Sequence, residues 1–178
     1  MSGLTDEEQR YAQAFAQAIA EDVRDHPPGS SLVRVVIRWF EAEDPTYFGV
    51  HALGLEDQAD VDPEDAWHPL EWPNVAEEEE RTERLGGHRS LQQAAEALKA
   101  QYLDAEDDRG SEWGPSPGTL AAVRRLPGAL REAEVGLEAH FAASAGHSDG
   151  RGCRDVLHAV ASRKVLKALA ARDELPDD

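Results

Sequence analysis

Residues 32–40, Leu-Val-Arg-Val-Val-Ile-Arg-Trp-Phe, carry the clearest β-strand signal in the chain. The stretch is rich in β-branched and aromatic residues, and a strand sends successive side chains to opposite faces. One face would carry Val33, Val35, Ile37 and Trp39, and the other would carry Arg34, Val36, Arg38 and Phe40. This alternation predicts a strand with one apolar face and one face that holds two arginines.

A second strand is predicted over residues 47–55, and Asp44-Pro45 before it is typical of a turn. The two strands are therefore predicted to form an antiparallel hairpin. A hairpin alone is only marginally stable, so we expect a third strand. The best candidate is residues 66–70, which Pro69 and Pro73 would confine to an edge of the sheet.

The rest of the sequence predicts helices. Thr5-Asp6-Glu7-Glu8 fits a capping box at the start of an N-terminal helix. The apolar stripe of this helix consists of Tyr11, Phe15, Ile19 and Val23. Further helices are predicted to begin near Asn74, Ser90, Thr119 and Gly152. The third of these is expected to break or kink at Pro127 and to resume until about residue 146, and the last to run to residue 172.

The predicted fold class is α+β, with an N-terminal helix, an antiparallel β-hairpin or small three-stranded sheet, and four to five helices packed on it. A single α+β domain is expected over residues 1–178, because no linker divides the chain. The sheet and an acidic aromatic segment would occupy residues 31–73, the helical part residues 74–172, and a frayed tail residues 173–178.

Negative charge is concentrated in the first half of the chain. The sequence has 36 acidic and 18 basic residues, for a formal net charge of −18. Residues 1–80 hold 20 acidic and 4 basic residues, whereas residues 81–178 hold 16 and 14. Such a field disfavours nucleic acids and anionic membranes as ligands and speeds encounter with cationic partners. General acidity that serves solubility, without any partner, is the alternative explanation.

The most acidic stretch is also aromatic. Residues 39–80 contain fourteen carboxylates, no lysine or arginine, and three of the four tryptophans. Of these acids, Glu77–Glu80 are explained by the first turn of a helix, where they favour the helix dipole. The candidate partner-binding residues are Asp57, Asp60, Asp62, Glu64, Asp65, Trp67 and Trp72. Tryptophans suit interface anchors and acids suit steering, but the tryptophans would equally serve to cover the hairpin as core residues.

A second group of residues suggests metal binding only weakly. His140, His147, Cys153 and His158 are of the types that ligate zinc, but their intervals of seven, six and five residues lack the close pairs of structural zinc sites. The acids of residues 57–65 lack the glycine of a calcium-binding loop. We expect neither a dedicated metal site nor a cofactor. The sequence also lacks the G-x-S-x-G, P-loop, dinucleotide-binding and H-E-x-x-H motifs, so no catalytic residue is predicted.

The sequence favours a cytoplasmic, soluble protein. Its one cysteine, Cys153, excludes an intrachain disulfide. Residues 1–25 do not resemble a signal peptide, and no apolar run approaches the length of a membrane span.

The order of elements is similar to that of the small acidic α+β immunity-type proteins of bacterial polymorphic-toxin systems. The resemblance rests on the hairpin at residues 33–55 and on the turn Trp67-His68-Pro69-Leu70-Glu71-Trp72, which is less than half of the chain. Proteins of this type inhibit a partner toxin by occlusion, often with an acidic face against a basic nuclease. The resemblance therefore implies a binding protein without catalytic residues.

Three functional hypotheses follow. The first is a non-catalytic acidic binding protein that presents residues 41–80 to a basic protein partner. The second is a metal-dependent enzyme built on the C-terminal histidines and cysteine. The third is a structural or oligomeric protein that uses the aromatic turn as a self-interface. The sequence leaves the oligomeric state open.

Overall fold

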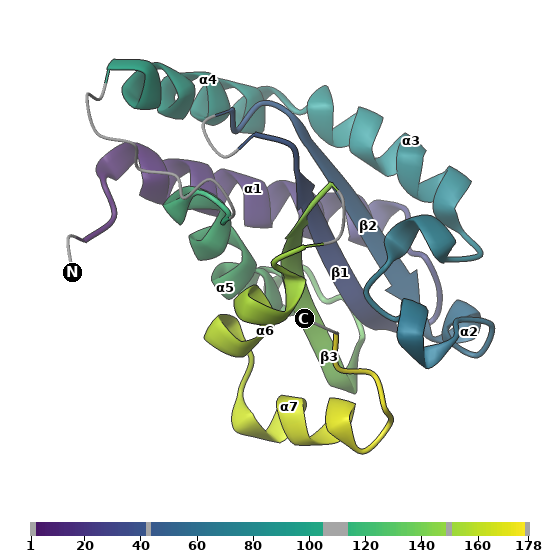
Figure 1. Ribbon diagram of the computed structural model, residues 1–178. Coiled ribbons are helices and arrows are strands. Elements are labelled where there is room, and N and C mark those ends of the chain that lie inside the picture. Colours follow the sequence, from purple (N-terminus) through teal and green to yellow (C-terminus); the bar gives the residue numbers. More distant parts are fainter. Residues whose placement is uncertain (1–2, 42–43, 105–113, 149–150, 177–178) are drawn as a thin grey trace.

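Strand β1 (Leu32–Trp39) is the centre of a three-stranded mixed sheet in the computed structural model (Figure 1), which describes residues 3–41, 44–104, 114–148 and 151–176. It pairs antiparallel with β2 (Phe48–Gly54) and parallel with β3 (Leu137–His147), in the order β2-β1-β3. The chain thus has the predicted α+β fold, with an N-terminal helix, the hairpin and several helices packed on the sheet. Trp113, which the sequence suggests as a lid packed on the core from the loop of residues 111–118, lies outside the described residues.

The third strand is not where the sequence placed it. Residues 66–70 form no strand, and residues 137–147, expected to be helical, form β3. The segment resembles a helix because alanines dominate it and because Leu137 and Phe141 are spaced four apart. Pairing with β1 along its length overrides this local preference, since buried ladder hydrogen bonds and packing outweigh a propensity difference of a few tenths of a kcal/mol per residue.

The end of the helix before β3 explains why the predicted helix was continued too far along the chain. Helix α5 (Pro117–Glu132) passes through Pro127 without breaking, and Glu134, two residues after its end, has a positive φ of 61°. The amide of Val135 then donates to the Leu130 carbonyl and that of Glu134 to the Arg131 carbonyl, which is the pattern of a Schellman cap. Glycine usually occupies this position and marks the end of a helix in a sequence. Because Glu134 stands there instead, the sequence gives no signal that the helix stops.

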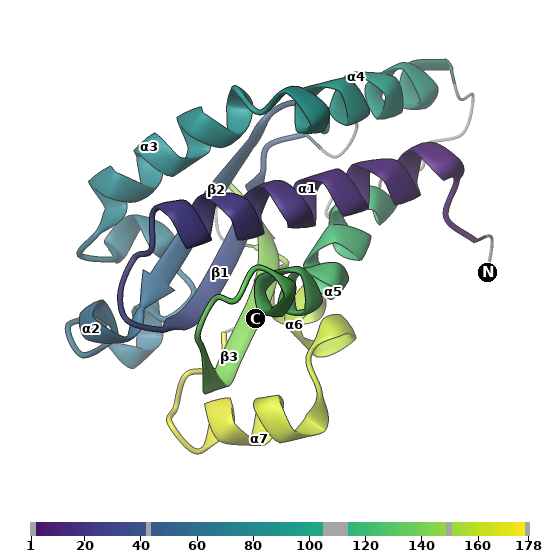
Figure 2. The same ribbon diagram turned by 180° about the vertical axis from the view of Figure 1, so that it is seen from behind.

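The first face of the sheet is covered by α1 (Asp6–Asp25) and α5, with α4 (Arg89–Asp104) beside them (Figure 2). The capping box of Thr5 and Glu8 is present, and the predicted stripe of α1 is buried. From the strands, the cluster receives Leu32, Val35, Ile37, Trp39, Val50, Ala52, Phe141, Ala143 and Ala145. Leu32 replaces the predicted Val33 because the register is irregular between Leu32 and Arg34.

Helix α3 (Val75–Gly86) covers the free edge of β2. Its Thr82 hydroxyl accepts a hydrogen bond from the Val50 amide at 2.9 Å and donates to the Val50 carbonyl. The helix begins after Asn74, as the sequence predicts, but the Asn74 side chain does not cap it and its amide donates instead to the Ala52 carbonyl at 3.0 Å. These side chains occupy backbone groups that an exposed edge strand would offer to another chain.

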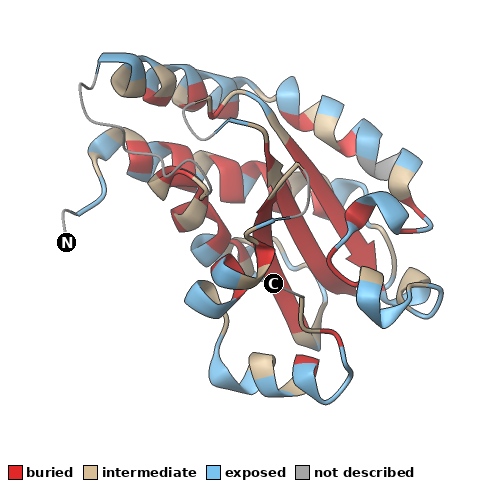
Figure 3. Ribbon diagram, viewed as in Figure 1, coloured by how far each residue is buried: buried red, intermediate tan, exposed pale blue. Residues whose placement is uncertain are grey.

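The C-terminal residues and the 55–73 segment cover the second face of the sheet. The segment contains α2 (Leu55–Gln58) and 3₁₀ turns at Pro63–Asp65 and Pro69–Glu71. The predicted last helix is divided by Ala161 and Ser162 into α6 (Cys153–Val160) and α7 (Arg163–Ala170). Figure 3 shows that all three strands are largely buried, so the sheet is covered on both faces.

Candidate functional site

The second face of the sheet contains a buried ion pair. Arg34 is only 1% exposed, and its guanidinium donates to the carboxylate of Glu174 and to the Val33 carbonyl. The guanidinium also lies 5.1 Å from the ring centroid of Trp67. Burial lowers the pKa of Arg34 to about 10, although Glu174 acts in the opposite direction. The arginine is still charged at neutral pH. A buried charge of this kind is stable only while its carboxylate partner stays in place.

This partner lies in the segment that was predicted to fray. Asp173 has a positive φ of 59°, and the amide of Glu174 donates to the Leu169 carbonyl. The chain therefore reverses after α7, and Glu174 is buried against the sheet. The prediction of a frayed tail is wrong for residues 173–176, because one local turn brings a carboxylate to a buried arginine. Residues 177 and 178 lie outside the described residues.

Both candidate tryptophans are core residues. Trp67 and Trp72 are 3% and 2% exposed, so neither presents an anchor to a partner in this structure. The Trp67 indole N–H donates to the Glu174 carbonyl at 2.6 Å, and that of Trp72 to the Asp65 carbonyl at 3.1 Å. Their rings pack with Val36, Leu53 and Leu157. Of the two alternatives, core packing is the correct one, and the aromatic surface required for self-association is absent from these residues.

Hydrogen bonds hold both ends of the acidic loop, which we define as residues 56–65. Glu56 accepts hydrogen bonds from the Ser30 amide at 2.9 and 3.0 Å, which holds the start of the loop. The Trp72 bond to Asp65 holds its end. Between these points, Asp60, Asp62 and Glu64 are exposed, and within the described part of the chain no lysine or arginine pairs with them. Asp57 and Asp65 are half-buried, and Asp65 lies 3.8 Å from His68.

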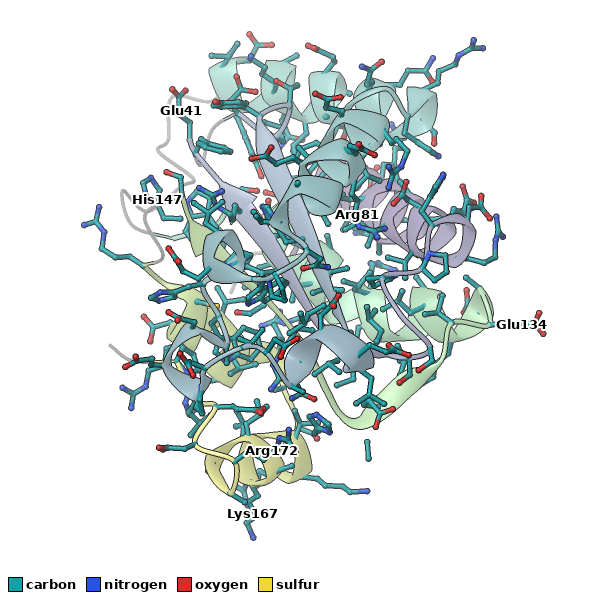
Figure 4. All side chains as sticks on the ribbon, turned by 90° about the vertical axis from the view of Figure 1, so that its right-hand side faces the viewer. Glu41, Arg81, Glu134, His147, Lys167 and Arg172 are labelled. Carbon is teal, nitrogen blue, oxygen red and sulfur yellow. The ribbon has the colours of Figure 1, made fainter. Side chains whose placement is uncertain are left out.

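Three bases of the surrounding elements are engaged with other groups or directed away from this loop. Arg172 donates to the Glu174 carboxylate at 2.9 Å. Figure 4 shows Lys167 on the outer side of α7, pointing away from the sheet, and Arg81 between α1 and α3. Arg81 is buried and pairs with Asp22. The acidic loop therefore keeps its negative charge as a fixed surface feature.

A pocket opens on the same face of the sheet, at the carboxyl ends of β1 and β3. It has a volume of about 170 Å³. The sheet and its connections contribute Val36, Arg38, His147, Ser148 and Cys153, and the turn after the acidic loop contributes Trp67, His68, Pro69, Leu70 and Glu71. Arg38 donates to the Ser148 carbonyl at 2.9 Å, and partial burial lowers its pKa. In open sheets, ligands are commonly bound at the carboxyl ends of parallel strands.

His51 is a further buried titratable residue on this face, beside Arg38. Burial, together with the positive charges of Arg38 and Arg81, lowers the pKa of His51 to about 4. Its Nδ1 has no hydrogen-bond partner among the described residues. Sequence reasoning missed His51, Arg38 and Glu174 as site residues. The only signal was that arginines alternate with buried residues in β1, and that pattern equally fits a solvent-facing strand face.

The structure brings two of the candidate metal ligands, His147 and Cys153, to the lining of one pocket, but it does not bring the four together. Cys153 is buried, and burial raises the pKa of its thiol to about 12, which disfavours the thiolate that zinc requires. His140 contacts the Gln58 side chain, His147 lies against the ring of Trp39, and His158 is exposed. Within the described residues, no group of three or more histidine, cysteine, aspartate or glutamate side chains has the geometry to hold a metal ion. The metal-dependent enzyme hypothesis thus gains no support.

No helix in the described ranges combines the length and the apolar character that crossing a bilayer requires.

Comparison with known proteins adds no identity to these observations: no family model matches the chain, and no curated protein or solved structure shows significant similarity to it.

Proposed function

We propose that this chain is a non-catalytic binding protein that presents its acidic loop to a basic protein partner. The observation that carries the proposal is that Asp60, Asp62 and Glu64 are exposed and unpaired in the described structure, on a loop fixed at both ends. A fixed loop loses little conformational entropy on binding, so its charges are preorganised. The resemblance to immunity-type proteins makes a basic toxin the first partner to test.

The loop is better suited to binding than the other acidic surface, on α3. Glu79, Glu80 and Glu83 of α3 belong to the exposed polar face of a regular helix, where charged residues are usual. The side-chain carboxylates of Asp60, Asp62 and Glu64 cap no helix and make no hydrogen bond within the described structure. Local stability therefore does not account for these three carboxylates, whereas recognition of a cationic surface does.

The test compares two triple variants with the same net charge. The loop variant is Asp60→Asn, Asp62→Asn, Glu64→Gln, and the control is Glu79→Gln, Glu80→Gln, Glu83→Gln on the exposed face of α3. Each protein is used to capture binding proteins from the native cell, and the captured partner is purified and titrated by calorimetry. We expect the loop variant to bind a basic partner at least about tenfold more weakly, and the control to bind it like the unmodified chain.

Equal weakening by both variants would mean that overall charge, not the loop, attracts the partner. An unchanged affinity of the loop variant would also refute the proposal. Asp57 and Asp65 are left unchanged because both side chains are half-buried and that of Asp65 lies 3.8 Å from His68, so their substitution would disturb the loop itself.

A further inference from the structure

Two arginines on the same face of β1 have different partners. Arg34 and Arg38 are four residues apart, so both point to the second face of the sheet. Arg34 pairs with the carboxylate of Glu174 and lies over the aromatic ring of Trp67. Arg38 has an aromatic ring, that of Phe40 at 5.6 Å, and the Ser148 carbonyl. Within the described parts of the chain, Arg38 has no carboxylate partner.

The Arg38 guanidinium is only partly buried and keeps N–H donors available to a ligand. A guanidinium has five N–H donors, and one hydrogen bond to a backbone carbonyl uses only one of them. A partly buried cation gains most from a carboxylate, because two parallel hydrogen bonds and opposite charge replace the lost hydration. The pocket beside Arg38 is where such a carboxylate would lie.

The other walls of the pocket define the rest of the ligand. Val36, Trp67, Pro69 and Leu70 provide apolar surface, and Leu70 is 49% exposed at the rim. A volume of about 170 Å³ is below the range of roughly 300–1,000 Å³ that accommodates drug-sized ligands. The pocket therefore fits a small molecule with one negative charge and a compact apolar part.

We propose that this pocket binds a small organic carboxylate, which pairs with the Arg38 guanidinium and packs its apolar part against Trp67 and Leu70. The site is separate from the acidic loop, and its existence does not depend on the proposed function. Glu71 also lines the pocket and is exposed, so it opposes an anion from the rim without pairing with Arg38.

The test uses benzoate as the probe and benzamide as its neutral counterpart of the same shape. Binding is followed by NMR of the amide groups of residues 67–71 and 147–148 and of the Trp67 indole, at pH 7 and 150 mM salt. We expect saturable shifts with benzoate, with a dissociation constant on the order of 1 mM, and binding of benzamide at least about tenfold weaker.

Variants then locate the bound carboxylate. Arg38→Gln removes the charge, and we expect it to weaken benzoate binding at least about tenfold. Arg163→Gln removes the same charge from the exposed surface of α7 and is expected to leave binding unchanged. Leu70→Trp fills the rim of the pocket from an exposed position, so it should block binding while the chain stays folded. Glu71→Gln is expected to strengthen binding by about twofold.

Three outcomes would overturn the proposal. The first is the absence of saturable shifts in these residues, and the second is equal binding of benzoate and benzamide. The third is full affinity in Arg38→Gln, with its fold verified by thermal unfolding. If Arg38→Gln does not fold, Leu70→Trp decides alone, because full affinity in that variant would place benzoate outside the pocket.

Discussion

The two faces of the sheet are buried by different physical means. On the first face, apolar side chains of the strands meet the apolar stripes of α1 and α5. On the second face, Arg34, Arg38, His51 and Ser144 lie among apolar residues, and Arg34 and Ser144 have specific partners in the Glu174 carboxylate and the Cys153 carbonyl. Hydrophobic burial is nondirectional, whereas a buried charge is tolerated only with a carboxylate or a hydrogen-bond acceptor in place. The first face therefore contributes stability through apolar burial. The second face contributes specific pairing of buried polar groups, and it contains the pocket.

Truncation of the first face should have the largest effect. Phe15 of α1 is fully buried, and its ring lies 4.6 Å from that of Phe48 and 5.4 Å from that of Tyr11, measured between centroids. We expect Phe15→Ala to lower the free energy of unfolding by about 4 kcal/mol, because it removes buried apolar area and leaves a cavity. Urea denaturation measures the change, with Gln13→Ala on the exposed side of the same helix as control. A loss below about 1 kcal/mol would contradict this description of the face.

On the second face, the loss should depend on which partner is removed. We expect Glu174→Ala to lower the free energy of unfolding by about 3 kcal/mol, because it leaves the Arg34 charge buried without a carboxylate. The double variant Arg34→Met, Glu174→Ala removes the charge as well and should recover most of this loss. Thermal or urea unfolding of the three proteins completes the comparison. If the double variant is less stable than Glu174→Ala, the arginine does not depend on its carboxylate.

His51 makes the second face sensitive to acid. Its folded pKa of about 4 lies below the usual value of 6.5, so below pH 6.5 the unfolded chain takes up a proton that the folded chain does not. This proton uptake stabilises the unfolded chain. The free energy of unfolding is therefore unaffected by His51 protonation above pH 6.5 and falls by about 2–3 kcal/mol as the pH is lowered toward 4.

The measurement is the difference in unfolding free energy between the unmodified chain and His51→Gln at several pH values from 7.5 to 4. Subtraction removes the contribution of the many carboxylates, which both proteins share. We expect the unmodified chain to lose more stability than the variant over this window. Parallel curves would show that His51 titrates normally in the folded protein.

The contrast between the faces also explains what was predictable. The hairpin, α1 and its stripe were predicted because each is encoded by neighbouring residues, such as the alternation in β1 and the spacing from Tyr11 to Val23. Strand β3 was missed because its alanines favour a helix locally and only pairing with β1 makes it a strand. The acidic loop was found from composition, but the position of Trp67 and Trp72 in the core depended on residues more than 80 positions away.

By itself, the sequence determined the α+β class, the hairpin, the N-terminal helix and the concentration of negative charge at residues 39–80, because periodicity, caps and composition are local properties. Only the tertiary structure decided that the sheet is covered on both faces, that Glu174 neutralises Arg34, and that Arg38 lies beside a pocket. The reason is that a buried charge pairs with an opposite charge that the fold brings close to it, and the two residues can be far apart in the sequence. The chain reversal at Asp173, which brings Glu174 to the sheet, leaves no periodic pattern in the sequence.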